Sequence, residues 1–192
     1  MKKKTIALVL ACILCVGIGI GGTLAWLTAT TDAVTNTFTT SDIDITLTET
    51  GMTNNANSYQ MVPGYTITKD PKVTVKAGSE KCYLFVKLEK SANFDSFMTY
   101  EMATDWTQLT GVDGVYYRTV DASATQNQEF EVIKDNTVTV KYSVTKDDMN
   151  GVTANPTLKV TAYASQYMKN NTENFTPVEA WGNISNPTGA TT

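Results

Sequence analysis

The side chains in this chain that could perform catalysis or bind a metal are few, and their types limit the chemistry available. The 192 residues include no histidine, so the commonest general base and the commonest zinc ligand are both missing. A serine or cysteine triad and a paired-histidine zinc motif are therefore excluded. We expect no catalytic residue, no metal site and no cofactor.

The three cysteines have different surroundings. Cys12 and Cys15 lie within an N-terminal apolar run, whereas Cys82 alternates with apolar residues in the pattern of a strand. We predict that Cys82 is a buried core thiol rather than a reactive one, and a single thiol cannot form an internal disulfide. Lipidation of Cys12 is the alternative use of that residue, but the apolar run continues well past it.

Two acidic clusters could supply oxygen ligands. The sequence Asp147-Asp148-Met149-Asn150-Gly151 lacks the ligand spacing and closing glutamate of a calcium loop. Its Asn-Gly pair instead predicts a hairpin turn. Asp42 and Asp44 alternate with the apolar residues of a predicted strand, so we expect them at a solvated edge.

Several aromatic residues could line a carbohydrate-binding surface, but we expect most of them to pack in the core or at its rim. They are Trp106, Tyr116, Tyr117, Tyr163, Tyr167 and Trp181.

The N-terminus predicts export. Lysines at positions 2–4 precede an apolar run over 6–20, and small residues lead to a cut site between Ala25 and Trp26. This is the pattern of a secretory signal peptide, and the run is shorter than the roughly 20 residues that span a bilayer. We therefore predict a secreted protein with residues 1–25 as the signal peptide and no membrane anchor after processing.

The mature chain would be acidic. Without residues 1–25 it has 167 residues, enough for one domain, with 12 basic and 19 acidic residues and a net charge of −7. Nucleic acid and anionic membranes would be repelled by such a surface. We expect neither as a partner.

Alternation of apolar and polar residues predicts at least seven strands in the mature chain. Helix is scarce: a short turn is possible over 93–100, and Thr176, Pro177 and Glu179 suit the start of a helix with a capping box. These features predict an antiparallel all-β sandwich or jelly roll over 41–192 with one or two short helices. The strands are predicted over 43–47, 65–69, 72–76, 81–90, 115–120, 138–144 and 158–166.

The segment 26–40 is rich in threonine, contains neither proline nor glycine, and carries spaced apolar residues at Trp26, Leu27, Val34 and Phe38. It has strand propensity but no obvious hairpin partner. It could form an edge strand of its own domain. It could instead add to the sheet of another molecule, and head-to-tail addition of this kind generates filaments.

Three blocks of residues resemble a known family. They are Gly21-Gly22-Thr23-Leu24-Ala25-Trp26-Leu27-Thr28 with the following Thr31-Asp32, Thr35-Asn36-Thr37-Phe38 and Asp42-Ile43-Asp44-Ile45-Thr46-Leu47; Pro63-Gly64-Tyr65-Thr66-Ile67-Thr68-Lys69-Asp70-Pro71 with Tyr83-Leu84-Phe85-Val86-Lys87; and Val160-Thr161-Ala162-Tyr163-Ala164-Ser165-Gln166 with Phe175-Thr176-Pro177-Val178-Glu179-Ala180-Trp181. These blocks resemble the TasA/camelysin family of exported proteins of Bacillus and clostridia, and they span nearly the whole mature chain.

The resemblance implies a jelly-roll protein that is cut by a SipW-type signal peptidase and polymerises with itself into extracellular biofilm-matrix fibres. In TasA-like fibres the mature N-terminal segment is donated as a strand to the adjacent subunit, and residues 26–40 match that segment by position. The segment 105–128 shows no family motif. Camelysin has been described as a metalloprotease, but this chain has no histidine, so the resemblance does not carry proteolysis here. The alternative functions are a surface-binding or adhesin module and a divergent, camelysin-like metalloprotease.

Overall fold

The computed structural model describes residues 42–51 and 58–185, which all belong to the compact unit Thr40–Thr192. The predicted signal peptide and the segment 26–40 lie outside the described residues. The same holds for both residues of the predicted cut site, Ala25 and Trp26, and for Leu27, Val34 and Phe38.

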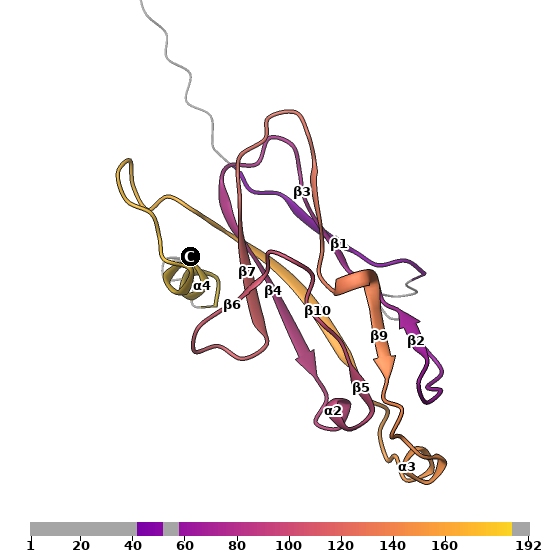
Figure 1. Ribbon diagram of the computed structural model, residues 1–192. Coiled ribbons are helices and arrows are strands. Elements are labelled where there is room, and N and C mark those ends of the chain that lie inside the picture. Colours follow the sequence, from indigo (N-terminus) through magenta and orange to yellow (C-terminus); the bar gives the residue numbers. More distant parts are fainter. Residues whose placement is uncertain (1–41, 52–57, 186–192) are drawn as a thin grey trace, which may run out of the picture. The chain divides into compact units, whose positions relative to one another are not determined.

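The described part of the chain is built from antiparallel sheets with a few short helices (Figure 1). Every strand pair in it is antiparallel, which confirms the predicted all-β class. The four-stranded sheet has the order β10 (Leu158–Gln166), β4 (Cys82–Lys90), β7 (Val115–Val120), β6 (Thr107–Gln108). The two three-stranded sheets have the orders β1 (Ile45–Thr48), β3 (Lys72–Val75), β8 (Gln128–Glu131) and β2 (Thr66–Thr68), β9 (Thr137–Val140), β5 (Met98–Thr99).

The two three-stranded sheets are halves of one bent layer. Along the chain β2 leads into β3 through Asp70-Pro71, and β8 leads into β9 through the 3₁₀ turn Lys134–Asn136. Proline has no N–H to donate to a ladder, so the regular pairing is interrupted there. Two backbone bonds continue the pairing across the bend: Val132 N–H donates to Pro71 at 3.1 Å, and Lys69 N–H donates to Asn136 at 2.8 Å.

The inner faces of the bent layer and of the four-stranded sheet share one apolar core. Alternate residues of β4 enter it because successive side chains of a strand point to opposite faces. Its fully buried members from the strands include Val73, Val75, Cys82, Leu84, Val86, Val120 and Val140.

The outer face of β4 is buried as well. Tyr83 and Phe85 lie under the C-terminal helix α4 (Pro177–Ser185), and the Trp181 ring lies 5.3 Å from the Phe85 ring and 5.3 Å from the Tyr163 ring. Figure 1 shows α4 beside the four-stranded sheet. This helix explains why the first half of the long central strand is apolar on both faces.

Several of the predicted elements agree with the structure. The strands over 115–120 and 158–166 are confirmed at those bounds, and the helical turn predicted within 93–100 is α2 (Phe94–Phe97). The strand predicted over 138–144 ends at Val140. The short strands β5, β6 and β8 were not predicted.

The hairpin turn predicted at Asn150-Gly151 is wrong. The segment forms the helix α3 (Lys146–Asn150), and Gly151 has a right-handed φ of −81° instead of the positive φ of a type I′ turn. The cause is a capping box: the Thr145 hydroxyl accepts from the Asp148 N–H, and the Asp148 carboxylate accepts from the Thr145 N–H at 2.8 Å. None of the helices in the described residues has the length and hydropathy of a membrane-spanning segment.

Candidate functional site

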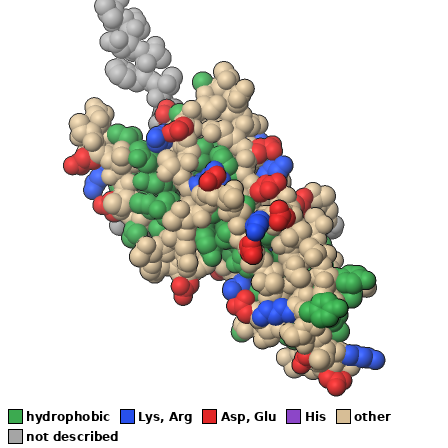
Figure 2. Space-filling model, in the orientation of Figure 1, with side chains coloured by type: hydrophobic (Ala, Val, Ile, Leu, Met, Phe, Trp, Pro, Cys, Tyr) green, Lys and Arg blue, Asp and Glu red, His purple; other side chains and the backbone are tan. Residues whose placement is uncertain are grey.

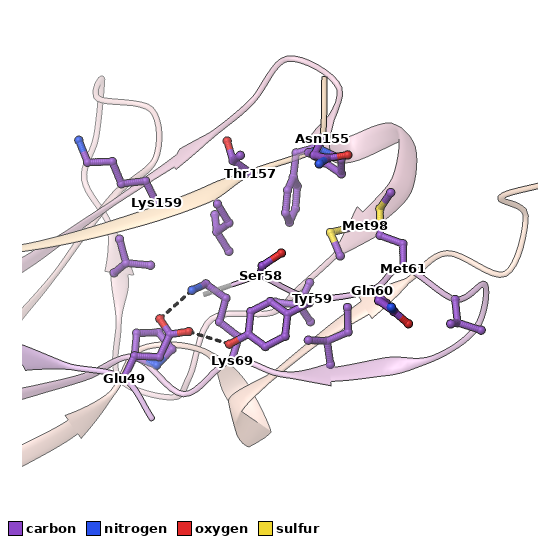
Figure 3. A pocket seen from close by; sticks show the side chains of 18 of the residues that line it. Glu49, Ser58, Tyr59, Gln60, Met61, Lys69, Met98, Asn155, Thr157 and Lys159 are labelled. Carbon is purple, nitrogen blue, oxygen red and sulfur yellow. Dashed lines mark hydrogen bonds and ion pairs between the residues drawn. The ribbon is translucent and has the colours of Figure 1, made fainter. Parts of the chain in front are cut away.

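A groove of about 980 Å³ lies between the first half of β10 and the β1–β2 side of the bent layer (Figure 3). We call it the edge groove. Its size is at the upper end of the roughly 300–1,000 Å³ of ordinary ligand pockets. Its lining residues are Leu47, Glu49, Ser58, Tyr59, Gln60, Met61, Val62, Ile67, Lys69, Pro71, Phe94, Met98, Val138, Met149, Asn155, Pro156, Thr157, Leu158, Lys159 and Val160.

The edge groove lies beside edge strands of two sheets. Among the strands of the described part, β10 pairs with β4 alone and β2 pairs with β9 alone. On the bent layer, β1 pairs with β3 as far as Thr48 opposite Lys72 and does not extend beside β2. A strand edge presents unpaired backbone N–H and C=O groups that can accept a further strand.

The floor of the edge groove belongs to the main core. Phe94, Met98 and Val138 are at most 9% exposed, and all three line the groove. Ile67 and Leu158 lie partly buried against the same core and line the groove too. An apolar side chain placed in the groove would therefore contact the interior of the domain directly.

One end of the edge groove carries a partly buried ion pair. The Lys69 ammonium lies 2.7 Å from the Glu49 carboxylate, and their side chains are 15% and 8% exposed. The Tyr59 hydroxyl donates to Glu49 at 3.1 Å (Figure 3). Each of the two ions therefore has a partner of opposite charge in a place with little solvent. An apolar neighbour could not replace either partner.

A charged cluster lies on the outer face of the β10–β4 pair. Lys159 and Glu89 are opposite each other in the register and alternate with Leu158 and Leu88, which pack on the core. Lys159 lies 3.2 Å from Glu89, which also receives Lys87 at 3.0 Å. Hydrogen bonds from these two lysines lower the pKa of Glu89. Two lysines therefore share one carboxylate on the outer face of the sheet, away from the floor of the groove.

The opposite flank of the core is closed by an aromatic stack. The Arg118 guanidinium of β7 lies 4.1 Å from the Phe130 ring of β8 and 5.5 Å from the Trp106 ring. The Trp106 indole N–H donates to the Glu131 carbonyl of β8 at 2.8 Å. These contacts join the two layers where β7 faces β8.

Cys82 is a core thiol, as predicted. It is 0% exposed, and burial raises its pKa to about 11. Asp42 and Asp44 are exposed, as expected for a solvated edge. No three acidic or cysteine side chains come together to hold a metal ion within the described ranges.

The aromatic residues named from the sequence do not form an exposed surface. All six are buried or half-buried, as in the case of Trp106 and Trp181. The most exposed aromatic side chains in the described part are Tyr142 at 90% and Tyr65 at 65%. On the face seen in Figure 2, basic and acidic side chains are interspersed between apolar ones.

The edge groove was not predicted from the sequence. Glu49 and Lys69 are 20 residues apart, and no sequence pattern pairs the two. The sequence indicated the groove only indirectly. The turn residues Pro63-Gly64 and Asp70-Pro71 bracket a strand that is too short to cover this side of the core. No protein-family model, no curated protein and no solved structure matches this chain.

Proposed function

We propose that this chain is a secreted structural protein that assembles with itself into extracellular biofilm-matrix fibres. In this proposal residues 26–40 of one molecule add as a strand in the edge groove of the next. The edge groove is the observation that carries it: two edge strands, β2 and β10, border an opening whose floor is the apolar core.

The physical argument is that such an opening favours a strand over a compact ligand. Backbone groups of an added strand pair with the free edge, and alternate side chains enter the groove. Lining side chains that are still partly exposed, such as Val62, Ile67 and Leu158, then lose contact with water, at about 25 cal/mol per Å² of apolar surface. Because the donated segment and the groove are different surfaces, the contact does not close on itself and continues as a filament.

The sequence features outside the described residues are consistent with this proposal. The pattern over 1–25 is that of a secretory signal peptide, and the residues around Ala25 and Trp26 resemble those cut by a SipW-type peptidase. The TasA/camelysin resemblance adds the jelly-roll topology, which we propose as the finer description of these antiparallel sheets. The proposal assigns no enzymatic activity to the chain.

Electron microscopy of two purified forms tests the proposal. The mature chain 26–192 is expected to form filaments, and the trimmed chain 41–192 is expected to stay monomeric. Circular dichroism and light scattering serve as the control that the trimmed chain is folded and monodisperse. Filaments of equal length from the trimmed chain would contradict strand donation by residues 26–40.

A further inference from the structure

The two most exposed aromatic side chains of the described residues lie at one end of the β2–β9 pair. Tyr142 is 90% exposed and Tyr65 is 65% exposed, and we call them the tyrosine patch. Figure 2 shows apolar side chains on the surface at this end of the molecule, at lower right. Neighbouring apolar side chains on a surface mark interaction sites, whereas scattered ones need no explanation.

A turn and a bulge hold Tyr65 in its position. Its N–H donates to the Val62 carbonyl at 3.0 Å across Pro63 and Gly64, and Gly64 has a φ of +77°. Proline at the second position and a glycine with positive φ at the third are features of a type II turn. Gly64 and Tyr65 then both lie opposite Val140: the Gly64 N–H donates to the Val140 carbonyl at 3.0 Å, and the Val140 N–H donates to the Tyr65 carbonyl at 2.9 Å. Two residues opposite one form a β-bulge, which bends the strand and re-aims its side chain.

Tyr142 lies against the glycine of the same turn. A Cβ at Gly64 would lie 2.6 Å from Cδ2 and 2.7 Å from Cε2 of the Tyr142 ring. The ring therefore occupies the space that any other side chain at position 64 would need, directly beside Tyr65. The preceding residue is fixed as well, since the Lys141 N–H donates to the Phe97 carbonyl at 2.8 Å. Both tyrosines are thus positioned before a partner binds, which reduces the entropy lost on binding.

The segments that carry the tyrosine patch contain no carboxylate side chain. Residues 58–69 and 137–146 include no aspartate or glutamate, although the whole sequence has 19 and a net charge of −4. The ammonium of Lys141, next to Tyr142, donates to the backbone carbonyl of Asp95. The patch therefore offers no acidic group to a cation, and the acidic protein around it repels a polyanion. A partner without net charge fits these surroundings.

Hydroxyl groups lie close to the two rings. Thr66 follows Tyr65 and is paired with Thr139 of β9, and their hydroxyl oxygens are 3.5 Å apart. The phenol groups of Tyr65 and Tyr142 also donate and accept hydrogen bonds. A pyranose ring has the complementary pattern, with C–H groups on its faces and hydroxyl groups at its rim. Its C–H groups stack on the electron-rich faces of aromatic rings, and its hydroxyls pair with those of the protein.

The tyrosine patch is small for a protein partner. A fully buried aromatic side chain contributes about 150–250 Å², so the two rings offer at most about 500 Å². A standard protein interface buries about 800 Å² on each partner. Val62 of the same turn is 39% exposed and adds little. The area is sufficient for a few sugar rings and falls short of a stable contact between two proteins.

We propose that the tyrosine patch binds a neutral polysaccharide, with pyranose rings stacked on Tyr142 and Tyr65. The Thr66 and Thr139 hydroxyls lie beside them as hydrogen-bonding groups. This inference goes beyond the proposed function and does not depend on it, because a monomer carries the same patch. In a fibre, the patch on each subunit would give the assembly many weak sites for one polysaccharide chain, and their combined affinity would exceed that of a single site.

Isothermal titration calorimetry on the mature chain 26–192 tests the proposal. The probes are neutral hexasaccharides of different linkage: cellohexaose, laminarihexaose, chitohexaose and maltohexaose. Oligogalacturonate serves as the anionic comparison. The variants are Tyr142→Ala, Tyr65→Ala and Tyr142→Phe, which keeps the ring. The matched control is Val178→Ala, a 52% exposed apolar position on α4, at the other side of the molecule in Figure 1. Urea denaturation establishes that each variant is folded.

At least one neutral hexasaccharide is expected to bind the native chain, and each alanine variant of the patch is expected to weaken it about tenfold. Tyr142→Phe and Val178→Ala should retain most of the affinity. No binding of any neutral probe, equal affinity of the native chain and Tyr142→Ala, or binding of oligogalacturonate alone would each overturn the inference.

Electron microscopy of the same samples separates this inference from the proposed function. Tyr142→Ala is expected to form filaments like the native chain while its sugar binding is weakened. Loss of filaments in Tyr142→Ala, with no sugar binding by the native chain, would make the patch a contact between copies and overturn the inference. Sugar binding by a native chain that forms no filaments would overturn the proposed function and support the inference.

Discussion

Gly114 and Gly78 both have a left-handed backbone, but they have different neighbours. Their φ angles are +71° and +88°. A Cβ at Gly114 would lie 2.5 Å from the Leu88 carbonyl oxygen, whereas a Cβ at Gly78 would meet nothing within 4 Å. The Gly114 carbonyl also accepts from the Leu88 N–H at 2.8 Å, so this approach is part of the β4–β7 pairing.

We therefore predict that Gly114→Ala lowers the free energy of unfolding more than Gly78→Ala does. The second variant bears only the backbone cost, about 1–2 kcal/mol. The first adds a clash with backbone that cannot move without breaking the sheet. Urea denaturation of both variants measures the difference, and equal losses would show that the strands separate easily there.

Cys82 gives a second prediction at this scale. Its pKa is raised to about 11 and its side chain is 0% exposed, and the thiolate is the form that reacts. The folded mature protein is expected to resist a thiol reagent at about pH 8 and to react fully in denaturant. Stoichiometric labelling of the folded protein would contradict the core assignment.

The sequence predicted Cys82 but not the ion pair in the edge groove, and the reason is periodicity. Cys82 belongs to a run in which every second side chain enters the core. Glu49 and Lys69 come from two different segments, on opposite sides of the turn residues 63–64, and meet at 2.7 Å only after the layer bends. Long-range pairs of this kind leave no local pattern in a single sequence.

At the scale of elements, α4 shows how a short helix is held in place. The Thr176 hydroxyl accepts from the Glu179 N–H at 3.2 Å, and the Glu179 carboxylate accepts from the Thr176 N–H at 2.8 Å. This confirms the capping box predicted from the sequence. The helix carries Ala180 and Trp181 onto the outer face of β4.

We predict that Thr176→Ala lowers the free energy of unfolding by about 1 kcal/mol at neutral pH. The backbone and hydroxyl hydrogen bonds of Thr176 lower the pKa of Glu179 from its ordinary 4.5. The carboxylate therefore stabilises the fold above pH 4.5, and this contribution is lost as the pH falls through the lowered value.

The difference between the native chain and Thr176→Ala should shrink on acidification, as measured by urea denaturation across pH. Asn183→Ala, at an exposed position of the same helix, serves as the matched control. A difference that stays constant down to acid pH would show that the Glu179 carboxylate has no part in the cap.

The strands that the sequence did not predict lack a readable alternation. β5 and β6 have two residues each, and Phe130 is the single apolar residue of the four in β8. Their position depends on pairing with β9, β7 and β3, which the local sequence does not encode. At 146–150 the Asn150-Gly151 pair is typical of a turn, but the Thr145–Asp148 capping box makes the segment helical.

At the scale of the whole molecule, the proposed function links export and assembly through residue 26. Cleavage between Ala25 and Trp26 would free the segment that the edge groove is proposed to accept. We predict that a precursor with a blocked cut site, such as Ala25→Tyr, forms no filaments, while the processed chain does. Electron microscopy of both forms checks this, with the mature N-terminus established by mass spectrometry. Filaments from the uncut precursor would show that assembly does not depend on cleavage of the signal peptide.

The flank closed by Arg118 limits how many neighbours a subunit can have. A strand could enter between β7 and β8 only by expelling a guanidinium from between two aromatic rings, 4.1 Å and 5.5 Å away. A subunit of the proposed fibre would then receive one neighbour at the edge groove and donate to one other. Each subunit of such a polymer contacts two neighbours, so the polymer does not branch. Its two ends are chemically different. A free peptide of residues 26–40 would terminate growth at the end with the empty groove and leave the other end unaffected.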